Sequence, residues 1–378
     1  MGGGVAVLGA GGFVGARLLE MAVLSGRTDI VPVVRSFRSV ARSAQLAVPH
    51  RLADTSSHES LLRALDGCDA VVNLTAGKPY EILPTTENIY RAARAAGARL
   101  LIHISSAAVF GEIDRPDLPD DAPPRLEQWW PYAREKGRAE NLLRERMAGD
   151  GQVAIVVLRP SLVWGPSSQW VLGPASELVR GAAYLRGDGA GICNLMYVDD
   201  LVRSIDAVVA HGAAAPSGFF NVADDIVPNW REYYTALAEG LGIDPATIHS
   251  VPEDGYRPGL LERLEPLREH RAYAWLKERI SLETRTHLKS RIALRGKGEP
   301  LPGAAARPVV TRTMWEVQAT RYPLPTTKFR ATFGTPNRVS FRSGIAASLA
   351  WLRFIGLVDR EPDLHAARTG VLAAAREH

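Results

Sequence analysis

The chain has only two cysteines, Cys68 and Cys193, in 378 residues. Two thiols cannot form a disulfide framework or a cysteine-rich zinc site, so we expect a reducing compartment, the cytoplasm. The nine histidines are scattered without the spacing of a metal site, so no metal is expected. No apolar run approaches the ~18 residues of a membrane span, and no basic signal region begins the chain.

Charge of one sign is also not in large excess, with 45 basic and 41 acidic side chains. Residues 251–378, however, hold 22 basic and 13 acidic side chains. The basic segment 257–342 could meet an anion, or it could be an arginine-rich solvated face. No recognised nucleic-acid module accompanies it, so we expect a small-molecule substrate and disfavour nucleic acid. A lid, a homodimer contact and a partner surface stay open for this segment.

The first 160 residues alternate short apolar runs with amphipathic patterns. The expected strands are 5–8, 30–34, 50–53, 70–74, 100–105 and 153–158, and the expected helices are 13–24, 57–65, 85–96 and 132–147. This alternation predicts an α/β fold with a doubly wound parallel sheet, the Rossmann type. We expect a dinucleotide-binding domain at 1–165, to which 195–225 returns. A smaller C-terminal substrate domain would comprise 166–194 and 226–378.

A glycine-rich turn follows the first expected strand and opens the first expected helix. It reads Gly9-Ala10-Gly11-Gly12-Phe13-Val14-Gly15. Glycines at such a turn let backbone amides approach a pyrophosphate at the positive end of a helix. The turn therefore predicts a dinucleotide cofactor.

The end of the second expected strand predicts which cofactor binds. Arg35 and Arg38 follow it, and no acidic residue occurs between Asp29 and Asp54. An acidic residue at this place binds the adenosine ribose of NAD, whereas a cation accommodates the 2′-phosphate of NADP. We therefore expect NADP, with Arg35 and Arg38 at its phosphate.

Tyr132 and Lys136 are spaced i and i+4, so they lie on one face of the expected helix. An ammonium beside a phenol favours the phenolate and lowers the pKa of the phenol. Such a tyrosine can exchange a proton with a hydroxyl or carbonyl while a hydride moves to or from nicotinamide. Ser106, at the end of the strand expected at 100–105, can hydrogen-bond the same oxygen.

These motifs resemble the extended short-chain dehydrogenase/reductase family, of the NAD(P)-dependent epimerase/dehydratase type. The resemblance covers most of residues 4–240. Its segments are the glycine turn, Asp54, Ala70 to Gly77, Ser105 to Gly111, Tyr132 with Lys136, Leu158 to Pro166 and Met196 to Leu201.

The resemblance implies that Ser106, Tyr132 and Lys136 form a catalytic triad, with Lys136 also binding the nicotinamide ribose. Asp54 would meet the adenine amino group. The remaining cofactor contacts that it implies are Thr75, Ala76 and Gly77 at the adenosine half, and the stretch from Pro160 to Val163 at the nicotinamide amide.

Two departures from the family and a group of tryptophans bear on the substrate. Dehydratases carry Thr-Asp-Glu where this chain reads Ser106-Ala107-Ala108, which disfavours dehydration. Nucleotide-sugar epimerases usually place a diphosphate-binding arginine at the position of Cys193. The tryptophans near the expected site could stack on a flat ligand or pack in the core; they are Trp129, Trp130, Trp164 and Trp170.

Together these features predict an NADP-dependent oxidoreductase acting on a secondary alcohol or ketone of a polar, sugar-like substrate. One alternative is a nucleotide-sugar epimerase that retains NAD(P) and passes through a transient ketone. The other is a non-catalytic protein that senses the cofactor.

Overall fold

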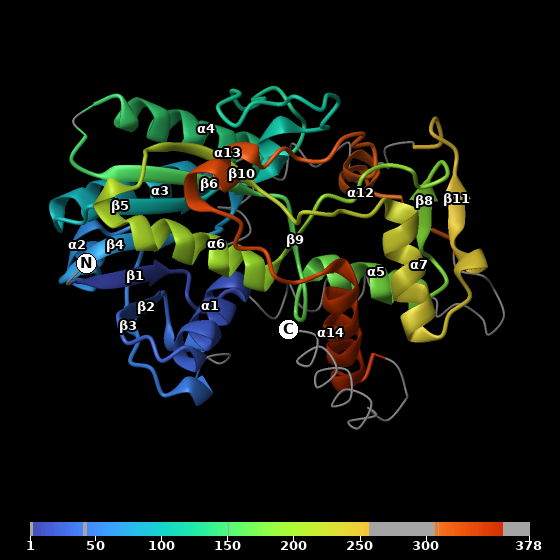
Figure 1. The fold of residues 1–378 in the computed structure, drawn as a ribbon, viewed down its shortest axis with the longest axis horizontal. Coiled ribbons are helices and arrows are strands. Elements are labelled where there is room, and N and C mark those ends of the chain that lie inside the picture. Colours follow the sequence, from blue (N-terminus) through green and yellow to red (C-terminus); the bar gives the residue numbers. More distant parts are fainter. Residues whose placement is uncertain (1–2, 41–43, 150, 257–306, 309, 358–378) are drawn as a thin grey trace, which may run out of the picture.

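A seven-stranded parallel sheet forms the centre of the computed structural model (Figure 1), which describes residues 3–40, 44–149, 151–256, 307–308 and 310–357. In sheet order the strands are β10 (Gly218–Val222), β6 (Ala154–Pro160), β5 (Leu100–Ile104), β4 (Cys68–Asn73), β1 (Gly4–Leu8), β2 (Ile30–Val34) and β3 (Arg51–Leu52). The order reverses beside β1, and this switch point is where a doubly wound sheet binds its ligand. The predicted fold class is confirmed.

Helices cover both faces of this sheet. On one face lie α1 (Phe13–Leu24), α6 (Val198–His211) and α13 (Thr327–Phe333), and on the other lie α2 (His58–Leu65), α3 (Pro79–Ala95) and α4 (Pro131–Met147). Each face has its own apolar core, because successive strand residues point to opposite sides: Val5 and Val7 face α1, whereas Ala6 and Leu8 face α2 and α3.

Local sequence explains most of these bounds, and α1 and β2 have the predicted ones. The main difference is α3, which begins at Pro79, six residues before the predicted start at 85. Pro79 suits the first helical position, and the side chain of Glu81 accepts a hydrogen bond from the backbone N–H of Lys78. Pro84 lies inside the helix but close to its start, so few backbone hydrogen bonds are affected.

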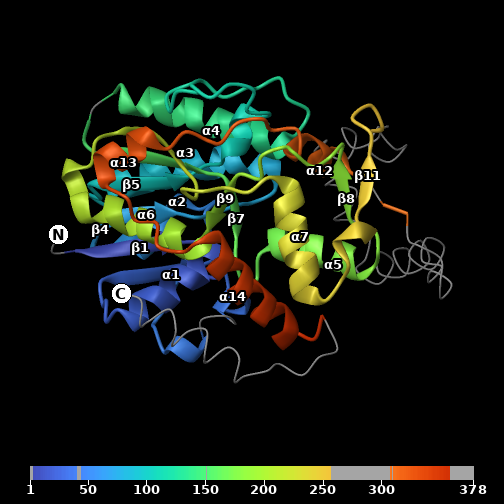
Figure 2. The same ribbon diagram turned by 45° about the vertical axis from the view of Figure 1, so that its right-hand side comes forward.

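The remaining elements extend the molecule beyond the carboxyl ends of the main strands (Figure 2). They include two small parallel sheets, with β7 (Leu162–Trp164) beside β9 (Leu195–Tyr197) and β8 (Tyr184–Arg186) beside β11 (His249–Val251). The helices here are α5 (Gln169–Val179), α7 (Trp230–Leu241), α12 (Arg312–Val317) and α14 (Phe341–Phe354). Between the last two, α13 (Thr327–Phe333) returns to the main sheet, where Phe329 and Phe333 pack on Phe220 of β10.

Short 3-10 helices connect several elements: η1 (Phe37–Val40), η2 (Ala44–Leu46), η3 (Ala107–Phe110), η4 (Gly212–Ala214) and η5 (Pro245–Thr247).

Of the basic segment 257–342, residues 257–306 and 309 lie outside the described residues. None of the described helices is both long enough and apolar enough to span a membrane. In the same part of the chain, no three side chains of metal-binding type come together.

A fully buried ion pair joins α4 to the neighbouring strands. The Arg159 guanidinium of β6 donates two hydrogen bonds to the Glu140 carboxylate of α4, at 2.9 and 2.6 Å, and neither side chain is exposed. Ser105, directly after β5, donates a third bond to Glu140 at 2.5 Å. Arg159 also donates to the backbone carbonyls of Asp120 and Ala122 in the loop that leads to α4. The pair of Glu140 and Arg159 therefore connects α4 with β6, with the end of β5 and with the loop that leads to α4.

Replacing Glu140 by glutamine removes the charge while keeping the size of the side chain. Arg159 is then a buried charge without its partner, so we expect the free energy of unfolding to fall by about 3–5 kcal/mol. Urea denaturation followed by circular dichroism measures this. The control is Glu59→Gln, which breaks an ion pair with Arg63 on the surface of α2 and should hardly change the midpoint. Equal effects of the two substitutions would contradict the role of the buried pair.

Candidate active site

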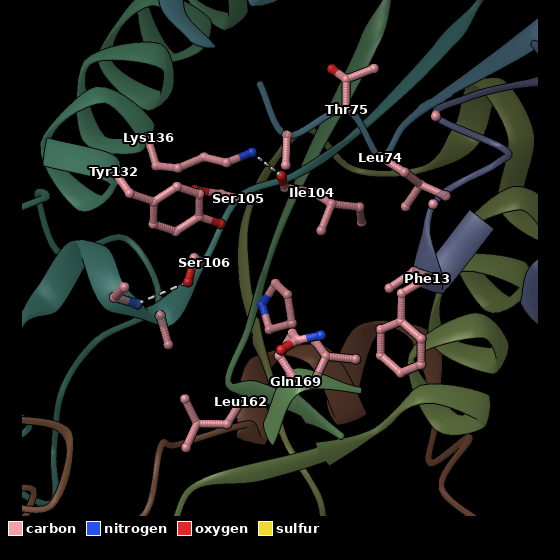
Figure 3. Close-up of a pocket in the computed structure, with 18 of the residues that line it drawn as sticks. Phe13, Leu74, Thr75, Ile104, Ser105, Ser106, Tyr132, Lys136, Leu162 and Gln169 are labelled. Atoms are coloured by element: carbon pink, nitrogen blue, oxygen red, sulfur yellow. Dashed lines mark hydrogen bonds between the residues drawn. The ribbon is translucent and has the colours of Figure 1, made fainter. Parts of the chain in front are cut away.

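A large cavity of about 1030 Å³ lies at the carboxyl ends of the main strands. Its wall is formed by the turn after β1, the ends of β2, β4, β5 and β6, the start of α4, and residues of α5 and α12. Figure 3 shows side chains from these elements pointing into one space, with Phe13 and Thr75 on one side and Tyr132 and Leu162 on the other. Residues of the glycine turn and the predicted triad line this one cavity.

The glycine turn leaves the N-terminus of α1 open to the cavity. Gly9 has φ +85°, which favours glycine. A Cβ atom on Gly15 would lie 2.4 Å from the carbonyl oxygen of Gly9, so the helix can start this close to β1 only with glycine there. Gly12 is exposed and lines the cavity, and the first turn of α1 has no acidic residue. A free helix N-terminus with this shape fits the pyrophosphate of a dinucleotide.

The predicted triad converges at the other part of the cavity. Tyr132 and Lys136 point inward from the first two turns of α4, and Ser106 lies beside the phenol (Figure 3). The Ser106 hydroxyl accepts a hydrogen bond from the backbone N–H of Ala108 at 3.2 Å, which holds it at the start of η3. The Lys136 ammonium donates to the carbonyl oxygen of Ile104 at 2.7 Å. All three side chains therefore face one space from fixed positions.

Burial dominates the titration of two of these groups. It lowers the pKa of Lys136 to about 8, and the nearby Glu140 carboxylate opposes this change. Burial raises the pKa of Tyr132, and a hydrogen bond with Ser106 opposes it. The lowered pKa of the phenol that the sequence predicts is therefore not found in this structure, because desolvation of Tyr132 outweighs the effect of its neighbours.

At the end of β2 only one of the two predicted arginines reaches the cavity. Arg35 is exposed and lines it, whereas Arg38 is exposed but is not among the lining residues. Asp54 is also outside the lining, between Ala53 and Thr55, which do line it. The backbone N–H and the hydroxyl of Ser56 both donate to the Asp54 carboxylate and lower its pKa, with a smaller contribution from Arg35.

A buried polar pair positions the loop after β4. The Asn73 side chain lies 3.0 Å from Nδ1 of His103 on the adjacent strand β5. The side-chain oxygen Oδ1 of Asn73 in turn accepts hydrogen bonds from the backbone N–H and the hydroxyl of Thr75, at 3.0 and 2.6 Å. Thr75 is thus held at the cavity wall. The predicted contacts that line the cavity with it are Phe13, Val14, Ala76, Gly77, Pro160 and Val163.

Other lining residues were not identified from the sequence. The polar ones among them are Ser39, Thr55, Glu81, Thr85, Glu112, Gln128, Ser167, Ser168, Gln169, Asn194, Thr313, Glu316 and Thr320. Most lie on loops or come from the chain after residue 300, where no motif marks them. Ser168 caps α5 with its side chain, and Gln169 is the first residue of that helix.

The tryptophans and Cys193 differ in whether they line the cavity or lie in the core. Trp129, Trp130 and Trp170 line the cavity, whereas Trp164 is fully buried and donates to Asp224 at 2.9 Å. Cys193 is fully buried in the core around α5 and α7, although its neighbours Ile192 and Asn194 reach the cavity. Ala107 and Ala108 line the cavity at the place where dehydratases carry carboxylates.

The chain is similar in sequence or in fold to several known enzymes. A 2-alkyl-3-oxoalkanoate reductase from Stenotrophomonas maltophilia (strain K279a) is 29% identical over 282 residues, which are 70% of this chain and 83% of the reductase. An N-acetyl-alpha-D-glucosaminyl-diphospho-ditrans,octacis-undecaprenol 4-epimerase from Escherichia coli O157:H7 is 26% identical over 65% of this chain and 74% of its own length. A dTDP-glucose 4,6-dehydratase from Streptomyces venezuelae, solved with NAD, has the same fold, with a TM-score of 0.66, 20% identity and coverage of 94% of this chain and 98% of the dehydratase.

The model of the NAD dependent epimerase/dehydratase family matches residues 5–223, more than half of the chain. This segment begins in β1 and ends just after β10, so it contains the whole main sheet and the predicted triad. The chain therefore belongs to the NAD dependent epimerase/dehydratase family and is an NAD(P)-dependent enzyme of the extended short-chain dehydrogenase/reductase type.

Proposed function

We propose that the protein is an NADP-dependent oxidoreductase that interconverts a secondary alcohol and its ketone. The observation that carries this proposal is that Ser106, Tyr132 and Lys136 face the same cavity as an open, glycine-flanked helix N-terminus. The reductase among the relatives supports it as well. The sugar-like substrate that the sequence favours stays a prediction, as do the cytoplasmic location, the homodimer and the division into two domains.

The triad can perform the proton transfer of this reaction. A bound nicotinamide cofactor supplies the hydride in reduction and accepts it in oxidation. During reduction Tyr132 gives its phenolic proton to the carbonyl oxygen, and the Ser106 hydroxyl hydrogen-bonds that oxygen. The Lys136 ammonium favours the resulting phenolate. With the hydride that a bound cofactor would supply to the carbonyl carbon, the proton from Tyr132 would complete the conversion of the ketone into an alcohol.

Tyr132→Phe removes only the hydroxyl that carries the proton. We expect turnover to fall at least about 100-fold while NADPH affinity changes little, because general acid catalysis contributes about that much. Steady-state kinetics and calorimetric titration measure the two effects. Tyr322→Phe is the matched control, since Tyr322 is partly exposed and does not line the cavity. Turnover within tenfold of wild type would remove Tyr132 from the mechanism and revive the non-catalytic alternative.

Gly12→Val places a branched side chain where the cofactor should approach the start of α1. The backbone of Gly12 has φ −77°, which valine can adopt, so the variant should fold. We expect NADPH affinity to fall at least tenfold, measured by calorimetry on protein whose circular dichroism is unchanged. Gly173→Val is the control, since a Cβ on Gly173 meets no atom within 4 Å. Undiminished NADPH binding by folded Gly12→Val would exclude this turn as the pyrophosphate site.

Arg35 supports the choice of NADP over NAD. Its guanidinium can donate paired hydrogen bonds to a 2′-phosphate, whereas NAD has a hydroxyl there. A charge-assisted contact is worth about 1.5–3 kcal/mol, so wild-type protein should bind NADP about ten- to a hundredfold more tightly than NAD. Arg35→Ala should remove most of that difference, and Arg38→Ala, outside the lining, should change it little. Equal affinities of the wild-type protein at fixed ionic strength would contradict the assignment.

A further inference from the structure

A row of three neighbouring aromatic rings, those of Trp129, Trp130 and Tyr132, lines the cavity. The rings of Trp129 and Trp130 are stacked, with centroids 6.4 Å apart and planes at 17°. The centroid of Trp130 lies 5.3 Å from that of Tyr132, with the planes at 42°. All three residues line the cavity, and both tryptophans are partly exposed. Aromatic surface is therefore available directly beside the reacting group.

Polar contacts hold Trp129, the first ring of this row, in place. The Trp129 indole N–H donates to the Glu316 carboxylate on α12. Arg312 donates to the same carboxylate at 2.8 Å, and its guanidinium lies 4.6 Å from the centre of the Trp129 ring. Arg134 also donates to the Trp129 carbonyl oxygen at 2.8 Å. Trp129 is thus fixed from both sides, and Trp130, stacked on it, has a defined position before any ligand arrives.

The reaction itself brings a substrate to Trp130. The oxygen of the reacting carbonyl must come within hydrogen-bond distance of the Tyr132 hydroxyl, about 3 Å. A ring attached to the carbonyl carbon then begins one covalent bond away from that carbon. Because the centroid of the Trp130 ring lies 5.3 Å from that of Tyr132, such a ring can reach the face of Trp130.

The charged side chains of the cavity wall bear on the substrate class. Three carboxylates line the cavity, Glu81, Glu112 and Glu316, and they are paired with Lys78, Arg321 and Arg312 respectively. Among the lining residues that the structure describes, the basic side chains are Arg35, beside the predicted cofactor phosphate, and Lys136, in the triad. Ile192, Val317 and Trp170 add apolar surface. Beyond Arg35 and Lys136 the described lining offers no cation to a phosphate, and an uncharged flat ring is compatible with these surroundings.

We propose that Trp130 is a specificity-determining residue that stacks on a planar ring next to the reacting carbonyl, and that the substrates are uncharged aryl ketones or the matching alcohols. This inference rests on the proposed function for the position of the carbonyl. It names a substrate class different from the sugar-like one predicted from the sequence, and the two can be separated by binding.

The test compares 2-acetylnaphthalene with 2-acetyldecalin, which has the same carbon skeleton without the planar ring. Their dissociation constants are measured by calorimetry with saturating NADP⁺, so that no turnover is required. Trp130→Leu should weaken binding of 2-acetylnaphthalene about three- to tenfold and that of 2-acetyldecalin less than twofold. Trp130→Phe should restore most of the loss. Trp351→Leu, on α14 and outside the cavity lining, is the matched control and should leave both constants unchanged.

Several binding results would contradict the inference. An equal loss for both ketones would mean that Trp130 supplies only apolar surface, and no loss, or no binding of either ketone to the wild type, would exclude stacking. UDP-glucose binding more tightly than 2-acetylnaphthalene would favour a nucleotide sugar. Reduction of the ketones by NADPH is followed separately. Binding that depends on Trp130 without any reduction would contradict the proposed function while the stacking site stands.

Discussion

The buried pair of Glu140 and Arg159 is the constraint on which the catalytic geometry depends. Glu140 lies one helical turn after Lys136 on α4, and its carboxylate accepts hydrogen bonds from Arg159 on β6 and from Ser105 at the end of β5. A charge this deeply buried is tolerable only with full hydrogen bonding, so the relative positions of helix and strands are closely restricted. The strand end before Ser106 is thereby joined to the helix that bears Lys136, and the same carboxylate opposes the loss of charge on Lys136.

The cavity unites parts of the chain that serve different tasks. The loops after the strands of the main sheet and the start of α4 supply the glycine turn and the predicted triad, as expected for ligands at the carboxyl ends of parallel strands. The chain after residue 310 crosses back over the site, where α12 supplies Glu316 and the segment behind it supplies Thr320. Asn194 anchors that segment by bonding the backbone of Tyr322 and Leu324. The predicted cofactor side of the cavity is therefore formed by local sequence motifs. The predicted substrate side depends on contacts between segments that are distant in the sequence.

This division explains how much the sequence could predict. The main strands, the glycine turn and the Tyr132–Lys136 pair follow from periodicity and spacing, which are local properties. The contact between Trp129 and Glu316 joins residues 187 positions apart, and no spacing rule connects them. The sequence also could not separate Trp130, at the cavity, from Trp164, in the core, because both flank the same motifs. Arg38 was expected at the cofactor because of its charge and Asp54 because of the family resemblance; neither lines the cavity, although their neighbours Ser39 and Thr55 do.

The central claim is that an exchangeable NADPH delivers a hydride to a ketone in this cavity. The most direct measurement uses NADPH deuterated at the transferring position of the nicotinamide, with 2-acetylnaphthalene as the ketone and mass spectrometry of the product. The account predicts an alcohol with one deuterium at the carbinol carbon and an equal amount of NADP⁺ released to solution. An alcohol without deuterium, or no net oxidation of NADPH together with a nucleotide released only on denaturation, would contradict it and favour an epimerase that retains its cofactor.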